Sequence, residues 1–167
     1  MGIGRPTPTA LVVAAMLVGC SMRGDAAVGP TVTVAEGRAE GVAWQFEVYR
    51  TSDGWCESIV FESSGSSGGC SEGEVEKAPE SLSFGQASGS GLPTITYGRT
   101  GEDAAAVRVT TRHDGDVKVQ TIEAPAGLDG AGQFFVAVLP EMSTVMSVAT
   151  LDDEGAILET VDTGLTP

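Results

Sequence analysis

The stretch GVAWQFEVYR, residues 41–50, decides the fold class because its apolar residues recur at every second position. Successive side chains of a β-strand point to opposite sides of the sheet. The residues between the apolar ones are mostly polar, so the pattern predicts a strand with one face in a core and one in water. The predicted core positions are Val42, Trp44, Phe46 and Val48.

The same period of two continues along most of the chain. Similar segments lie at residues 31–36, 55–62, 93–98, 104–112, 117–123, 144–151 and 156–162. Residues 63–92 are rich in Ser, Gly, Glu and Pro, and there we expect a loop with one short strand near residues 82–84. No window of twelve or more residues has the pattern of an amphipathic helix. The sequence therefore predicts about eight or nine short strands.

Three further segments refine this prediction. The run QFFVAVLP, residues 133–140, is apolar on both faces and predicts a central strand buried on both sides. Around HDGD, residues 113–116, we expect a hairpin whose odd-length loop, residues 114–116, puts Val107 and Val109 on the same face as Val117 and Val119. The turn DDEG, residues 152–155, places Gly155 where a positive φ is needed.

Together these patterns predict an all-β domain over residues 31–163, followed by a short tail at residues 164–167. Many short strands with frequent turns are typical of an antiparallel β-sandwich or barrel. We favour an immunoglobulin-like β-sandwich, and the alternative is a small closed β-barrel.

The N-terminus has the features of an export signal. Arg5 and the free amine give a positive start, residues 10–18 form an unbroken apolar run, and Gly19 is the small residue that a signal peptidase needs. The apolar run is too short to span a hydrocarbon core of roughly 30 Å as a helix.

The end of this run, Leu17-Val18-Gly19-Cys20, resembles the lipobox of bacterial lipoproteins. The resemblance implies cleavage after residue 19, so that residues 1–19 are a signal peptide, and attachment of diacylglycerol to the sulfur of Cys20. The alternative is an ordinary secretory signal with an incidental cysteine. Residues 20–30 would then be a lipidated cysteine and a flexible tether. The implied location is the extracellular side of the cell membrane.

Cys56 and Cys70 remain when Cys20 is assigned to lipid. An even number of cysteines in an exported domain indicates a disulfide. A zinc site is the alternative, but two cysteines and one distant histidine make a poor ligand set.

Charge limits the partners that the chain can bind. It has 23 acidic residues against 9 lysines and arginines, for a formal net charge of −14. Such a surface repels the phosphates of nucleic acids and anionic lipid headgroups. We therefore expect no nucleic acid, and contact with the membrane only through the lipid on Cys20. The expected partner is a cell-envelope protein, glycan or small ligand.

The chain offers little for catalysis. The single histidine, His113, lies in a predicted exposed turn, where a catalytic triad could not exclude water. Acidic residues gather in two places, but neither run has the spacing of an EF-hand loop, so we predict no metal site and no cofactor. These acidic residues are Glu72, Glu74, Glu76 and Glu80 in one segment and Asp152, Asp153 and Glu154 in another. Tyr49, on the polar side of its strand, is the candidate for a ligand-facing aromatic residue.

The segments DGWC, GGC, TYG, FFVAVLP and LDDEG loosely resemble those of exported actinobacterial domains without assigned function. This resemblance implies no catalytic residues. The working hypothesis is a surface lipoprotein that acts as a non-enzymatic binding or accessory module. The alternatives are an extracytoplasmic hydrolase that uses paired carboxylates and a calcium-stabilised structural module.

Overall fold

The computed structural model describes residues 27–72 and 81–165, and every regular element in these ranges is a β-strand. The strands are β1 (Val32–Ala39), β2 (Val42–Arg50), β3 (Gly54–Phe61), β4 (Gly65–Glu72), β5 (Ser83–Gly89), β6 (Leu92–Thr100), β7 (Ala106–Thr111), β8 (Asp116–Gln120), β9 (Ile122–Glu123), β10 (Gln133–Leu139), β11 (Val145–Leu151) and β12 (Ile157–Asp162). All of their pairings are antiparallel.

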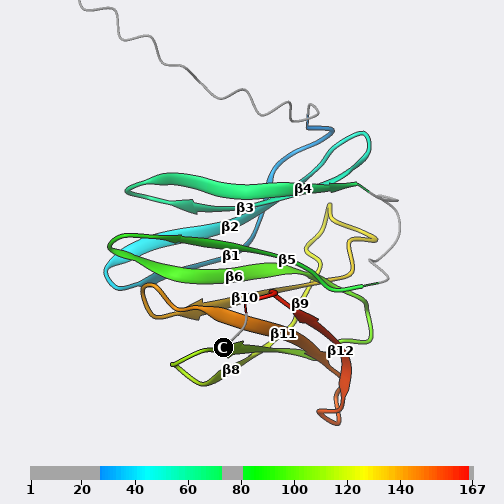
Figure 1. Ribbon diagram of the computed structural model, residues 1–167. Helices are drawn as coiled ribbons and strands as arrows, with labels where there is room; N and C mark the ends of the chain where they lie inside the picture. Colours follow the sequence, from blue (N-terminus) through cyan, green and yellow to red (C-terminus); the bar gives the residue numbers. More distant parts are fainter. Residues whose placement is uncertain (1–26, 73–80, 166–167) are drawn as a thin grey trace, which may run out of the picture.

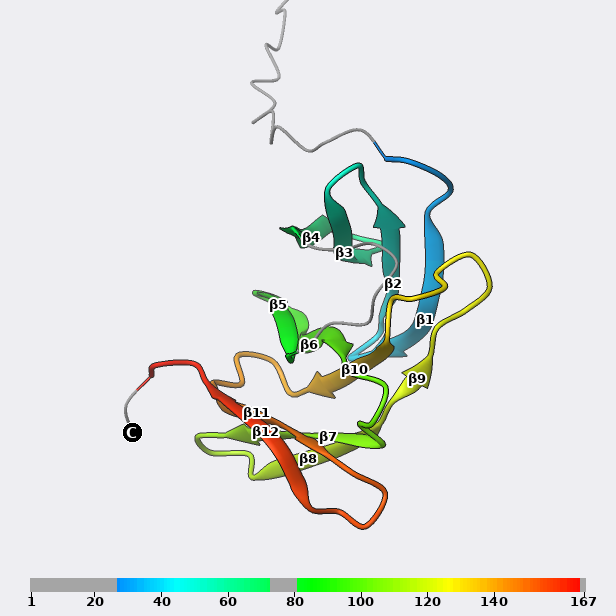
Figure 2. The same cartoon turned by 90° about the vertical axis from the view of Figure 1, so that its right-hand side faces the viewer.

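The strands form three four-stranded sheets. Sheet A has the order β1-β2-β3-β4, sheet B the order β5-β6-β10-β9, and sheet C the order β12-β11-β7-β8. The sheets are stacked as layers (Figure 1), and the turned view in Figure 2 shows sheet B between the other two. Only Thr121 separates β8 from β9, so one run of chain passes directly from sheet C into sheet B.

The predicted antiparallel β-sandwich is confirmed, and no sheet closes into a barrel among the described residues. The sandwich has three layers, whereas an immunoglobulin domain has two. A third layer is possible because β10 contributes side chains to a core on each of its two faces. Phe134 lies in the core between sheets A and B, while Phe135 lies in the core between sheets B and C. The prediction that this strand is buried on both sides is confirmed.

Each core is built from alternate residues of neighbouring sheets. The core between sheets A and B contains the larger aromatic side chains, and the core between sheets B and C is mostly aliphatic. The first includes Trp44, Phe46, Val48, Trp55, Ile59, Phe61, Ile95, Tyr97 and Phe134. The second includes Leu82, Val107, Val109, Phe135, Ala137, Leu139, Val145 and Val148.

The hairpin between β7 and β8 has the predicted shared face but a different loop. Val109 pairs with Val117, and the backbone N–H of Thr111 donates to the carbonyl of Gly115. The three loop residues are therefore 112–114 and not 114–116. The second predicted turn is confirmed, because Gly155 has a φ of 84°.

The prediction of a loop over most of residues 63–92 is wrong. Residues 65–72 form β4, and the short strand expected near residues 82–84 is present but extends over residues 83–89 as β5. Strand β4 has the sequence GSSGGCSE and no apolar alternation, because as the last strand of sheet A it buries almost no side-chain surface. Its backbone pairing with β3 holds it in the sheet.

The described chain begins beside sheet A, where the N–H of Val28 donates to the carbonyl of Arg50. The predicted signal peptide, Cys20 and most of the tether lie outside the described residues, as do Glu74, Glu76 and Glu80. Within the described part of the chain, no helix is long and apolar enough to cross a membrane.

Candidate functional site

Cys56 and Cys70 form the predicted disulfide. They are directly opposite one another on β3 and β4, with 4.0 Å between their Cα atoms. Tyr49 on β2 is in register with Cys56, so this row of side chains lies on the side of sheet A that faces away from sheet B. The bond attaches the last strand of the sheet to its neighbour.

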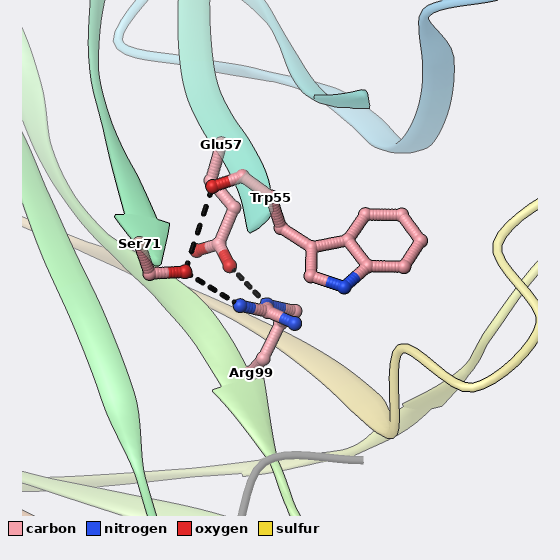
Figure 3. A network of polar contacts seen from close by, with 4 residues as sticks. All are labelled: Trp55, Glu57, Ser71 and Arg99. Atoms are coloured by element: carbon pink, nitrogen blue, oxygen red, sulfur yellow. Dashed lines mark hydrogen bonds and ion pairs between the residues drawn. The ribbon is translucent and has the colours of Figure 1, made fainter. Parts of the chain in front are cut away.

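On the opposite face of sheet A from the disulfide, a buried ion pair joins sheet A to sheet B. Glu57 follows Cys56 on β3 but points the other way, toward Arg99 on β6 (Figure 3). The Nε of Arg99 donates to Oε1 of Glu57 at 2.5 Å, and its Nη2 donates to the hydroxyl of Ser71 at 2.7 Å. The two charged side chains are only 5% and 9% exposed. The pair therefore links β3, β4 and β6 across the layer boundary.

Trp55 completes this network. Its indole ring lies 5.3 Å from the guanidinium carbon of Arg50 and 5.6 Å from that of Arg99. Figure 3 shows the indole ring of Trp55 beside Arg99. The backbone carbonyl of Trp55 faces Ser71, and the hydroxyl of Ser71 donates to this carbonyl at 3.5 Å. Cation–π attraction over a buried indole adds to the ion pair.

Burial changes the proton affinity of two groups in this network. Burial raises the pKa of Glu57, and the attraction and hydrogen bond of Arg99 oppose that rise. The pKa of Tyr97 is also raised, first by burial and second by the nearby charge of Glu57. The hydroxyl of Tyr97 donates to the carbonyl of Ser67 at 3.2 Å.

A small recess of about 130 Å³ lies beside this network, between β4 and β5. Glu57 of β3 and Tyr97 of β6 line it. The other lining residues are mostly small, namely Gly69, Cys70 and Ser71 from β4 and Ser83, Phe84 and Gly85 from β5. Among the described residues, Glu57 is the one carboxylate that lines it, and a glycosidase-type mechanism needs two. The recess suits water or a single side chain better than a substrate.

A larger hollow of about 720 Å³ lies over the outer face of sheet A. Its residues come from β1, β2 and the end of β3, where the outward side chains of neighbouring strands align. The amide of Gln45 donates to Glu36 at 3.4 Å, and Arg38 lies 3.9 Å from Glu62. The lining comprises Glu36, Gly37, Arg38, Ala43, Trp44, Gln45, Val60 and Glu62. This surface offers planar hydrogen-bond donors and acceptors to a ligand.

Gly37 and Trp44 also lie along the hollow, but the close contact between them lies on the core side of sheet A, where the indole of Trp44 is buried. They are paired in register, and a Cβ at position 37 would lie 2.7 Å from Cζ2 of the indole. Only glycine leaves room for the ring there. The indole Nε1 of Trp44 is buried and has no hydrogen-bond partner among the described residues.

Tyr49 lies on the same face of β2 as Ala43 and Gln45, is half-buried, and is not among the residues that line the hollow. The sequence placed it on the outward face but could not show where that face is hollowed.

The structure places His113 and the described acidic turn on the surface. The hydroxyl of Ser143 donates to Asp114 next to His113, whereas a catalytic triad needs the serine to donate to the histidine. The carboxylate of Asp152 accepts the N–H of Ala156 and so holds its turn together. Within residues 27–72 and 81–165, no group of three or more His, Cys, Asp or Glu side chains could hold a metal ion.

Sequence reasoning missed the pair formed by Glu57 and Arg99. A signal was present, because Glu57 falls in phase with Trp55 and Ile59 on the core side of its strand. A charge at a core position of a strand indicates a buried partner. The identity of that partner depends on which sheet faces it, and the sequence pattern does not contain that information.

Comparison of the chain with models of known protein families, with curated proteins and with solved structures found no match. The function must therefore be argued from the sequence and from these two sites.

Proposed function

We propose that this chain is a lipid-anchored cell-surface protein whose β-sandwich is a non-enzymatic binding module, with the hollow over sheet A as its ligand site. The observation that carries the proposal is this hollow, whose volume of about 720 Å³ suits a small ligand. The lipobox-like end of the signal segment, Leu17-Val18-Gly19-Cys20, supports the anchor. The Cys56–Cys70 disulfide fits an exported protein, because disulfides persist in oxidising compartments.

The lining of the hollow favours a ligand rich in hydroxyl groups, such as an envelope glycan. Glu36 and Glu62 accept hydrogen bonds, Arg38 donates them, and Gln45 does both. A hydroxyl group also donates and accepts, so neighbouring hydroxyls of a sugar can pair with these planar groups in turn. The side chains of Arg38 and Glu62 are 65% and 72% exposed, so a ligand in the hollow can reach them.

The anchor is tested by the intact mass of protein extracted from membranes. We expect a chain that begins at Cys20 and carries diacylglycerol and the Cys56–Cys70 disulfide. The variant Cys20→Ser should be found outside the membrane fraction. A purified native chain that still began at Met1, or that carried no lipid, would refute the anchor and leave the hollow untouched.

The ligand site is tested by titrating the chain with peptidoglycan fragments and soluble envelope polysaccharides. Arg38→Ala and Gln45→Ala should each weaken binding by about tenfold, since each removes hydrogen bonds to the ligand. Lys118→Ala is the matched control, because it removes an exposed charge from sheet C. Failure of the whole panel to bind, or equal affinity of the three variants, would contradict the proposal.

One observation favours the hydrolase as a second candidate, because Glu36 and Glu62 line the same hollow. Paired carboxylates are the usual machinery of glycoside hydrolysis. The same titration separates the two candidates by analysis of the glycan afterwards. If cleaved glycan is recovered with the wild type but not with Glu36→Gln or Glu62→Gln, the domain is an enzyme and not a binding module.

A further inference from the structure

Strand β4 has features that edge strands of natural proteins usually avoid. It is the outermost strand of sheet A, and no described strand pairs with its far side. All eight residues pair with β3 in unbroken register, so the strand has no bulge. It contains no proline and no charge before Glu72, and residues 65–70 are exposed. A long, regular, uncharged edge is a template for another strand.

The other five edge strands are each protected, which makes β4 the exception among the described strands. The bulges near Ala35 and Ser88 distort β1 and β5, and a third bulge lies between β11 and β12. Strand β9 has two residues, and β8 is short and carries Asp116 and Lys118. Bulges, short length and charge are the usual means of preventing edge pairing.

The position of the disulfide shows which backbone groups β4 presents. In antiparallel pairs, a Cα–Cα separation of roughly 4.5 Å marks a pair without mutual hydrogen bonds, against roughly 5.5 Å for a bonded pair. The 4.0 Å between Cys56 and Cys70 therefore marks an unbonded pair. The N–H and C=O groups of Cys70, and by alternation those of Gly68 and Ser66, point away from β3 toward the open edge.

We propose that an extended segment of a basic partner protein adds to β4 as a fifth strand of sheet A. Backbone hydrogen bonds to Ser66, Gly68 and Cys70 would supply the affinity. The net charge of −14 selects the partner, because it attracts a basic segment and repels a second copy of this chain. This site is separate from the hollow over β1 and β2.

The recess between β4 and β5 supplies a pocket for one side chain of the added strand. Figure 2 shows β4 and β5 at the same side of the molecule, as edges of adjacent sheets. Every second side chain of an added strand would point toward this recess. Its lining includes Glu57, whose carboxylate can accept hydrogen bonds, and Tyr97, whose hydroxyl can also accept one, so it favours a side chain that donates hydrogen bonds.

The test uses the isotopically labelled full chain, carrying Cys20→Ser, and a short peptide of alternating lysine and threonine. We expect amide chemical-shift changes along β4 and slower hydrogen exchange at Ser66, Gly68 and Cys70. A glutamate–threonine peptide and a lysine–threonine peptide with alternate amides N-methylated are the controls. Neither should slow the exchange, because the first is repelled and the second lacks the donors.

A matched pair of variants tests the backbone directly. Ser66→Pro removes one N–H that points to the open edge and leaves the hydrogen bonds to β3, whereas Ser66→Ala keeps that N–H. We expect Ser66→Pro to weaken peptide binding by about fivefold and Ser66→Ala to leave it unchanged. If Ser66→Pro does not fold, the N-methylated peptide tests the same hydrogen bonds from the other side.

Three results would overturn the proposal. The first is an absence of shifts along β4 at saturating peptide, and the second is equal binding of the N-methylated peptide. The third is protection of Ser66, Gly68 and Cys70 that rises with protein concentration when no peptide is present, since this would show that a second copy occupies the edge. None of these results bears on glycan binding in the hollow.

Discussion

Glu57 and Arg99 are two opposite charges enclosed between sheets A and B. Removing charges from water is costly, and a buried pair repays that cost only when its geometry is good and its remaining hydrogen bonds are made. Here the guanidinium of Arg99 also donates to the hydroxyl of Ser71 and lies over the indole ring of Trp55. We infer that the pair fixes how sheet A sits on sheet B more than it adds to stability.

Arg99→Met should lower the free energy of unfolding by about 3–5 kcal/mol, because it leaves the Glu57 carboxylate buried without its partner. The double variant Glu57→Leu/Arg99→Met should recover most of that loss, since it removes both charges. Urea denaturation of the two variants measures the difference. A loss below about 1 kcal/mol for the single variant would show that water reaches the pair.

The raised pKa of Glu57 makes stability depend on pH. The folded chain holds this proton to a higher pH than the unfolded chain, whose glutamate titrates near 4.5. The stability that the proton contributes is therefore complete below pH 4.5 and is lost as the pH rises through the folded pKa.

We accordingly expect the wild type to lose stability relative to Glu57→Gln as the pH rises above 4.5. Denaturation of both proteins from about pH 4 to about pH 8 provides the measurement. The comparison cancels the many other carboxylates, which titrate in both proteins. A gap that stays constant with pH would contradict the assignment.

At the scale of the element, β4 depends on its neighbour. It buries no large apolar side chain, so the disulfide and the backbone pairing with β3 hold it. Cys56→Ala/Cys70→Ala should lower the free energy of unfolding by about 3 kcal/mol, as expected for opening a loop of about 15 residues. Amide exchange should become faster in β4 than in β12, which belongs to another sheet. An equal change in both strands would show that β4 is no weaker than the rest.

The strands that could be predicted are those whose apolar side chains show which of their faces are buried. Trp44 and Phe46 alternate with polar residues, and Phe134 and Phe135 show that both faces of β10 are covered. Strand β4 has no such pattern, because an edge strand of Ser and Gly is held by its backbone. The hollow could not be predicted either, since it depends on how three strands align, although the alternation in residues 41–50 does put Gln45 on the outward face.

At the scale of the whole molecule, β10 is shared by both cores. Phe134→Ala and Phe135→Ala should each lower the free energy of unfolding by about 3–5 kcal/mol, since both rings are fully buried. Hydrogen exchange should distinguish the two variants. Phe134→Ala should accelerate exchange mainly in sheet A, and Phe135→Ala mainly in sheet C. The same exchange pattern in both variants would mean that the layers open together.

The order of strands along the chain has a consequence for biosynthesis. Sheet A is built from the first four strands of the chain, whereas the later strands belong in alternating pairs to sheet B and to sheet C. A nascent polypeptide can therefore complete the pairing of sheet A once Glu72 has left the ribosome or the export channel. The aromatic side of that sheet is then covered only in part by β5 and β6 until Gln133–Leu139 brings Phe134 into the same core. During this interval the protein is most exposed to chaperones and to aggregation.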